Sequence, residues 1–511
     1  MRSSTALRIL LVSLLFVSCD NTPEKQPEVL NIAVPYDPDT LDPHAKDLVG
    51  HFAVASNFYE PLVRLDARMR LMPCLAISWE NPDALTWIFH LRPSVEFHSG
   101  KVMTSRDVVF SLERLLRNEL LEMRAYLSGV AEVSTLDAST VRIQTTHPLH
   151  LLPNKLSFVH IVPEGSSDEM LAGKADGTAP YSLIGWERNK LVRMQRFPDH
   201  WSGAVVLPFA NLHLNTSAEQ AMKSLPERKF QLVRFDSKQS EPLIKGEVDY
   251  EILRNDTLFV SYLGFDLSRH VTPQCSAVPN PFKSLAVRRA IHLAMDRDKL
   301  VKNLAVFASP ATQPLPPFVF GYNPAIGLPK HDVTEARKLL TETGYGNGFD
   351  VTLDTSRGME PAAKLAAEQL REIGIRATVK AMPTSEYYRT LDSGDSSLFL
   401  SSYGCVTGDA SDYLDDALHS RDSSRRYGGS NFGRYFNPQI DRLIEQSAVI
   451  QKVENRRIRL QEIQSLTMQD LPWIPLFIDQ EVYAIDTRFS WQPRSDGFII
   501  AYEVILRSPD S

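Results

Sequence analysis

Two short runs near the start of the chain, TLDPH at residues 40–44 and NFYEPL at residues 57–62, say most about its fold. The first run follows residues 29–35 (VLNIAVP), where apolar side chains alternate as in a half-buried strand. Because Asp and Pro favour turns, Asp42-Pro43 predicts a fixed loop after that strand. We expect both residues to hold the loop rather than to serve a site.

Strand and helix signals interleave downstream of these runs. Thr104 and Asp107 form a capping-box pattern at a helix start, and Pro361 suits the first turn of a helix that ends at Gly374. Further helices are predicted at 286–304, 333–343, 439–451 and 455–469. Strands are predicted at 87–91, 133–136, 140–144, 181–184, 191–196, 376–381, 473–477 and 482–485. This mixture predicts layered α/β lobes rather than a bundle or a sandwich.

Length and charge narrow the class of protein. The chain has 511 residues, which exceeds the usual size of one hydrophobic core and predicts two or three lobes. The net charge is −7 with both signs interspersed, so no footprint for nucleic acid is visible. After residue 19 no apolar stretch reaches 18 residues, so no second membrane segment is expected.

The first residues have the pattern of an export signal. Arg2 and Arg8 flank the start of an apolar run at 9–17, and the run ends in FVSC at residues 16–19. We predict that residues 1–18 are a lipoprotein signal peptide, that Cys19 is lipidated, and that residues 19–28 are a flexible spacer. The alternative is an ordinary signal peptide with an incidental cysteine.

Common catalytic and metal-binding motifs are missing from the sequence. It has no Walker loop, HExxH, GxSxG or paired CxxC, so we predict no metal, no cofactor and no enzyme activity. The glycine-rich run at 344–348 (GYGNG) follows a helix and precedes a strand, which indicates a helix stop and a turn. His147 and His150 lie close together beside Pro148, and such a lone pair is more typical of a surface or a satisfied core than of a metal site.

A series of short motifs, in a specific order, resembles the family 5 extracellular solute-binding proteins, the oligopeptide- and dipeptide-binding components of ABC importers. The motifs are residues 40–44, 57–62, 73–80 (PCLAISWE), 89–92 (FHLR), 97–101 (FHSGK), 104–112 (TSRDVVFSL), 177–181 (GTAPY), 196–203 (RFPDHWSG), 287–291 (VRRAI), 295–297 (MDR), 431–435 (NFGRY) and 471–476 (LPWIPL). Ala179 and Ser99 depart from the usual glycine and aspartate.

The resemblance implies a periplasmic-binding-protein-like (type II) α/β fold, with two lobes around a ligand cleft and a third, smaller domain. We name these parts by residue: lobe I comprises 29–57, 176–268 and 481–511, domain II comprises 58–175, and lobe III comprises 269–480.

The resemblance also implies where a ligand binds. The family's acidic anchor for a ligand ammonium falls on Asp409, in a loop that reads GCVTGDASD at 404–412. The simpler alternative is that Asp409 caps a helix or turn, and Asp412 is expected to be structural. Gly404-Cys405 replaces the usual Gly-Trp, so an aromatic wall is missing. Ser401, Ser402 and Tyr403 stand where some oligopeptide binders carry an arginine.

Further cleft residues come from matching positions. Asp47 and Val49 match lining residues of one lobe, and Tyr126 matches a lining tyrosine opposite; each could equally be plain surface or core. The resemblance places two of the remaining cysteines in lobe III, so a Cys275–Cys405 disulfide is expected, although the sequence does not fix the pairing.

The predicted function is capture of short peptides, by a monomer tethered to a membrane through Cys19, for the permease subunits of an ABC importer. Alternatives are another family 5 ligand (nickel chelate, haem, oligosaccharide or opine), a signalling or adhesion lipoprotein that keeps the fold, and a hydrolase.

Overall fold

The computed structural model of the protein describes residues 29–507, apart from 236–237, 239–240, 245 and 247–248. The predicted signal peptide, the spacer and the lipidation site Cys19 lie outside the described residues.

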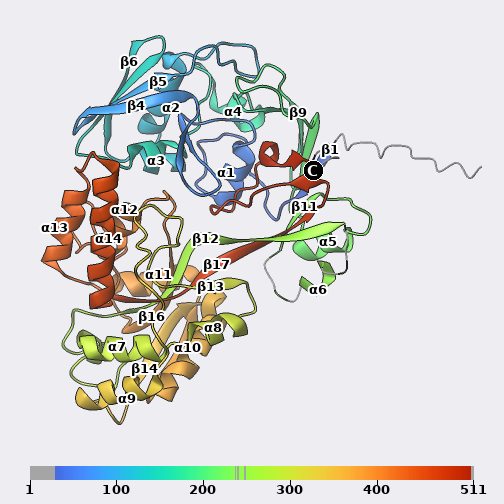
Figure 1. Ribbon diagram of the computed structural model, residues 1–511. Helices are drawn as coiled ribbons and strands as arrows, with labels where there is room; N and C mark the ends of the chain where they lie inside the picture. The colour runs from blue at the N-terminus through green and yellow to red at the C-terminus, as the bar shows by residue number, and fades with distance from the viewer. Residues whose placement is uncertain (1–28, 236–237, 239–240, 245, 247–248, 508–511) are drawn as a thin grey trace, which may run out of the picture.

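An eleven-stranded mixed sheet runs through the molecule in the order β15-β14-β16-β12-β17-β11-β1-β10-β9-β8, with β13 (Ala308–Pro310) paired to β17. Its two longest strands, β12 (Tyr250–Phe265) and β17 (Trp473–Asp486), are antiparallel neighbours at its centre. Figure 1 shows them running between the upper and lower parts of the molecule. The two strands predicted at 473–477 and 482–485 are therefore one continuous strand, which crosses the predicted limit between lobe III and lobe I.

One end of the sheet belongs to lobe I. Strand β1 (Val29–Ala33) is parallel to both of its neighbours, β10 and β11. Its alternating residues Leu30 and Ile32 are fully buried, as the sequence pattern predicts. The remaining elements of this lobe are α1 (Val49–Ala55), β8 (Tyr181–Glu187), β9 (Leu191–Arg196), β10 (Phe209–His213), α5 (Ala218–Lys223), β11 (Leu232–Phe235), α6 (Glu241–Ile244), β18 (Phe489–Ser490) and β19 (Ile505–Leu506).

The other end of the sheet belongs to lobe III. Its elements are α7 (Leu285–Ala294), α8 (Arg297–Asn303), α9 (Val333–Glu342), β14 (Phe349–Ser356), α10 (Glu360–Glu372), β15 (Ile375–Met382), α11 (Thr384–Ser393), β16 (Leu398–Gly404), α12 (Ala410–Tyr413), α13 (Pro438–Ser447) and α14 (Val453–Asp470). The single helix predicted at 286–304 is wrong. It breaks at Met295-Asp296, because the Asp296 side chain accepts a hydrogen bond from the Lys299 N–H and starts a new helix.

Domain II has its own four-stranded sheet, ordered β4-β5-β7-β6. Helix α2 (Ser105–Arg117) packs against this sheet and begins with the predicted capping box of Thr104 and Asp107. The other elements are β2 (Val63–Leu65), β3 (Leu71–Pro73), β4 (Ala76–Asp83), β5 (Thr86–Leu91), β6 (Val130–Asp137), β7 (Thr140–Thr145), α3 (Leu152–Leu156) and α4 (Asp168–Gly173).

Asp42 joins lobe I to domain II. Its buried carboxylate accepts hydrogen bonds from both terminal nitrogens of Arg114 in α2, at 2.6 and 3.0 Å. It also accepts from the His44 N–H at 3.0 Å. The structural role predicted for Asp42 is confirmed. Within the described residues, no helix is both long and apolar enough to cross a bilayer.

Candidate functional site

The candidate site is a cavity of about 730 Å³ beside the two long central strands. Lobe I contributes Tyr36, Val49 and Arg234 to its lining, and lobe III contributes residues 304–307, 358–359, 361–362 and Ser402. The volume suits a small-molecule site, since such pockets span about 300–1,000 Å³.

Strand register explains which side chains form the floor of this cavity. Ser261 of β12 is paired with Ser402 of β16 on one side and with Phe477 of β17 on the other. Side chains alternate along a strand, so Asp479 and Glu481 point to the same face as Phe477. All five residues line the cavity.

Asp479 is the unusual group in this floor. Its backbone lies opposite Ala308 of β13. No described residue donates a hydrogen bond to its carboxylate, and no described cationic side chain pairs with it. Burial, together with repulsion from Glu481, raises the pKa of Asp479 to about 6. At neutral pH the cleft therefore holds an uncompensated negative charge, which a ligand cation would stabilise.

The other acidic side chains of the cavity are already paired. Glu481 lies 2.9 Å from the guanidinium of Arg234 and accepts a hydrogen bond from the Tyr483 hydroxyl. Asp496 lies 2.6 Å from Arg494. Asp479 is thus the acidic lining residue left for a ligand.

Three buried hydroxyls around the cavity also lack partners among the described residues: those of Tyr36, Ser261 and Ser402. A buried hydroxyl without a hydrogen bond costs roughly 1–3 kcal/mol. Together with Asp479 they offer donors and one anionic acceptor to a polar ligand. Within the described residues, no group of three metal-ligating side chains is present.

Asp409, the predicted anchor, has a different environment. Its carboxylate receives two hydrogen bonds from Arg456 of α14, at 2.6 and 2.8 Å, and one from the Ser411 N–H at the start of α12. Burial favours a higher pKa for Asp409, but the charge and hydrogen bonds of Arg456 outweigh it and lower the pKa. The alternative expected for Asp409, capping of a helix, is what the structure shows, and the pairing with Arg456 neutralises the carboxylate within the protein.

The predicted disulfide is also corrected, because Cys275 and Cys405 are free thiols. Cys275 lies beside Val351 in β14, near the residues that pair with the first residue of β16, whereas Cys405 follows the end of β16. In this parallel register Val351 lies level with Ser396, nine residues before Cys405. At about 3.3 Å per residue the two cysteines lie roughly 30 Å apart along the sheet, too far for a bond. The Cys405 thiol instead donates to the Asp409 carbonyl oxygen at 2.9 Å.

The remaining predicted residues divide between the cavity and its surroundings. Val49 lines the cavity. A side chain at Gly404 would collide with Phe259, which lines it too. The hydroxyl of Tyr126 donates to Asp47 at 3.0 Å, so these two residues contact each other across lobe I and domain II. Tyr403 donates its hydroxyl within lobe III, to the Asp412 carbonyl oxygen at 3.0 Å.

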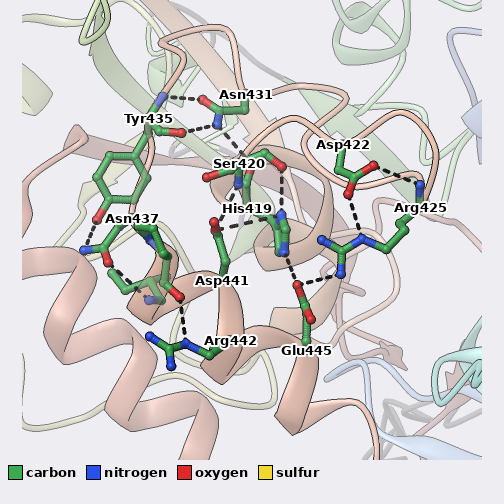
Figure 2. A network of polar contacts seen from close by, with 12 residues as sticks. His419, Ser420, Asp422, Arg425, Asn431, Tyr435, Asn437, Asp441, Arg442 and Glu445 are labelled. Carbon is green, nitrogen blue, oxygen red and sulfur yellow. Dashed lines mark hydrogen bonds and ion pairs between the residues drawn. The ribbon is translucent and has the colours of Figure 1, made fainter.

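A polar network holds the loop that follows the Asp409 segment (Figure 2). His419 is buried, with Nε2 3.1 Å from Glu445, which also binds Arg425 at 2.9 Å. Asn431 donates to the His419 carbonyl oxygen and accepts from the Tyr435 N–H. These side chains are committed to one another, so the 431–435 motif fixes the loop onto α13.

Comparison with known proteins identifies the family. The sequence model of the bacterial extracellular solute-binding proteins, family 5 (middle), matches residues 70–425, more than half of the chain. The chain belongs to this family. Family 5 proteins are the solute-binding components of ABC importers and act outside the cytoplasm. The two-lobed α/β fold with a smaller third domain, predicted by resemblance, is confirmed.

Individual relatives span most of this family 5 protein. The glutathione-binding protein GsiB of Escherichia coli K12 is 26% identical over 469 residues, 87% of this chain and 88% of GsiB. Heme-binding protein A of Haemophilus influenzae is 25% identical over 443 residues, 79% of this chain and 78% of its own. The unliganded open form of MppA, a periplasmic murein tripeptide binding protein, is 19% identical with a TM-score of 0.83, covering 95% of this chain and 99% of MppA.

Sequence reasoning missed Asp479. The triplet Asp479-Gln480-Glu481 stands between two apolar runs and reads as a break between strands. A signal was present, because apolar residues on both sides with no Gly or Pro in the triplet fit one long strand with a polar patch.

Proposed function

We propose that the protein captures short peptides outside the cytoplasmic membrane and delivers them to an ABC permease by closure of lobes I and III. The observation that carries the proposal is the unpaired Asp479 carboxylate in the 730 Å³ cavity between the lobes. A peptide ammonium would form a charge-assisted hydrogen bond there, one of the stronger polar contacts available to a ligand.

The cavity also suits the rest of a peptide. The Ser261 and Ser402 hydroxyls can bind backbone groups, while Phe259, Phe307 and Phe477 offer apolar wall for side chains. Closure would exclude water and strengthen each polar contact. Two relatives are named for peptide ligands, GsiB for glutathione and MppA for a murein tripeptide, which supports the same class here.

Native mass spectrometry of protein purified without refolding tests this proposal. We expect bound mass that fragments into amino-acid residues. A metal chelate, haem, an opine or a sugar in its place would contradict peptide binding. Haem is the second candidate ligand, because one relative is named heme-binding protein A. Binding without an uptake defect on gene deletion would favour a signalling or adhesion lipoprotein, and turnover of peptides would favour a hydrolase.

We further propose that the protein works as a monomer tethered through a lipid on Cys19. The signal pattern at residues 1–19 supports the anchor, and the polar, proline-bearing composition of residues 19–28 suits a tether between the lipid and the protein. Radiolabelled palmitate should be incorporated into the wild-type protein and lost in Cys19→Ala. Equal labelling of the two would contradict the anchor.

A further inference from the structure

A second cavity, of about 470 Å³, lies between domain II and lobe III. It shares no lining residue with the cleft that contains Asp479. Trp79, Trp87 and His150 line it from domain II, and Phe320 and Arg456 line it from lobe III. The position of this cavity means that an occupant would touch two parts of the molecule at once.

The walls of this cavity hold several unsatisfied polar atoms. Within the described residues, both ring nitrogens of His150, Nε1 of Trp87 and Nε of Arg456 are buried and have no hydrogen-bond partner. Native proteins leave few buried polar atoms unpaired. Four such atoms on three side chains around one cavity indicate a partner that the protein chain itself does not supply.

The charge of the cavity wall selects the partner. Burial, with the charge of Arg456, lowers the pKa of His150 to about 3, so its ring is neutral and offers one N–H donor and one acceptor. The charge of Arg456 is neutralised by Asp409, which it binds through two nitrogens at 2.6 and 2.8 Å. The other charged lining residue, Glu80, is exposed to solvent and lies 3.7 Å from His90, so its charge is hydrated rather than enclosed. The buried part of the wall therefore offers a charged ligand no uncompensated countercharge, whereas a neutral ligand avoids that cost.

The apolar part of the wall selects the shape of the partner. Trp79 and Trp87 flank Phe89 with ring centroids 6.5 and 6.4 Å apart, and Arg456 lies 5.4 Å from the centre of the Phe320 ring. Flat aromatic surfaces of this kind favour stacking with another ring.

We propose that this cavity is a second binding site, for a small neutral aromatic molecule that carries a hydrogen-bond acceptor next to a donor, as an aryl carboxamide does. The ring stacks in the aromatic wall, and the carboxamide pairs with His150, Trp87 and Arg456. Because these nitrogens are shielded from water, binding includes a turn of the His150 ring toward the cavity. The occupant bridges domain II and lobe III and thereby couples to cleft closure.

The test is a titration of the mature protein with benzamide, followed by tryptophan fluorescence. The matched variant is His150→Phe, which keeps a ring of similar size and removes both nitrogens. The control is His147→Phe, the same replacement at an exposed histidine that does not line the cavity. We expect saturable binding to the wild type, about tenfold weaker binding to His150→Phe, and wild-type binding to His147→Phe. No saturable response, equal binding to the wild type and to His150→Phe, or loss of binding in His147→Phe would each overturn the proposal.

A ligand-free measurement makes the test independent of the probe. Because the His150 nitrogens form no bonds within the described protein, His150→Phe should keep or raise the Tm. A lower Tm would show that these nitrogens stabilise the fold, for example through a buried water, and would overturn the assignment to a ligand. Benzoate should bind more weakly than benzamide, and tighter binding of benzoate would contradict the choice of a neutral ligand.

Discussion

Asp409 is buried and Asp479 is half-buried; both belong to lobe III, and their environments are opposite. Asp409 follows β16, caps α12 and receives two hydrogen bonds from Arg456. Asp479 lies in the middle of β17, faces the cleft and receives none from the described residues. The pKa of Asp409 is lowered, whereas that of Asp479 is raised to about 6.

The contrast separates a structural carboxylate from one that is available to a ligand. A buried charge with its partner in place stabilises the fold only as part of the pair, and removing one partner strands the other. A buried charge without a partner destabilises the empty protein and gains its partner on binding. Stability and affinity should therefore respond oppositely at these two positions.

The largest expected effect is on stability, at Asp409. Asp409→Ala removes the two carboxylate oxygens that accept from Arg456 and leaves its largely buried guanidinium without a countercharge, bonded only to the Ser411 hydroxyl. The free energy of unfolding should therefore fall by about 3–5 kcal/mol. Urea unfolding followed by circular dichroism measures the change. Unchanged stability with lost peptide affinity would reverse the roles that we assign to the two aspartates.

Asp479→Asn should raise the free energy of unfolding, the opposite of the effect expected for Asp409→Ala. The folded-state pKa of Asp479, about 6, lies above the ordinary aspartate value of 3.8, so folding favours the protonated acid. Wild-type stability should therefore fall as the pH rises from about 4 to 6 and then level off. At pH 8 the Asn variant should be more stable than the wild type by about 1–3 kcal/mol. A less stable variant at pH 8 would mean that Asp479 has a partner in the empty cleft.

The affinity for a peptide should depend on whether the Asp479 carboxylate is protonated. A peptide ammonium binds the ionised carboxylate, so affinity should be constant above about pH 7 and fall by about tenfold per pH unit well below the pKa of Asp479. Calorimetry between pH 4.5 and 8 measures this dependence. The nearby groups Glu481, Arg234 and Asp496 are retained in Asp479→Asn, so a flat profile in that variant assigns the proton. If the affinity of the wild type and of Asp479→Asn depended on pH in the same way, the titrating proton would belong to another group.

The smallest effect concerns the cysteines. With Cys275 and Cys405 free, a reductant should not change the Tm. Maleimide should label Cys275, which is partly exposed, in the folded protein and reach buried Cys74 and Cys405 only after unfolding. A mass two units lower than that of the reduced protein would indicate a disulfide and contradict this arrangement.

The sequence predicts local structure well where the pattern is local. The first strand, the Thr104–Asp107 capping box and the helix that begins near Pro361 all depend on residues a few positions apart. The pairing of Asp409 with Arg456 joins residues 47 positions apart, and a single sequence carries no sign of it. Asp479 was missed because a polar triplet inside a long crossing strand resembles a loop until its neighbours β12 and β13 are known.

The most direct test of the central claim is a calorimetric cycle with Ala-Ala-Ala and its N-acetylated form, on the wild type and on Asp479→Asn. If Asp479 binds the ligand ammonium, acetylation of the peptide should weaken its binding free energy to the wild type by at least about 2 kcal/mol. Acetylation should leave the binding free energy to the Asn variant almost unchanged. An acetylation penalty that is equal in the two proteins would contradict the account.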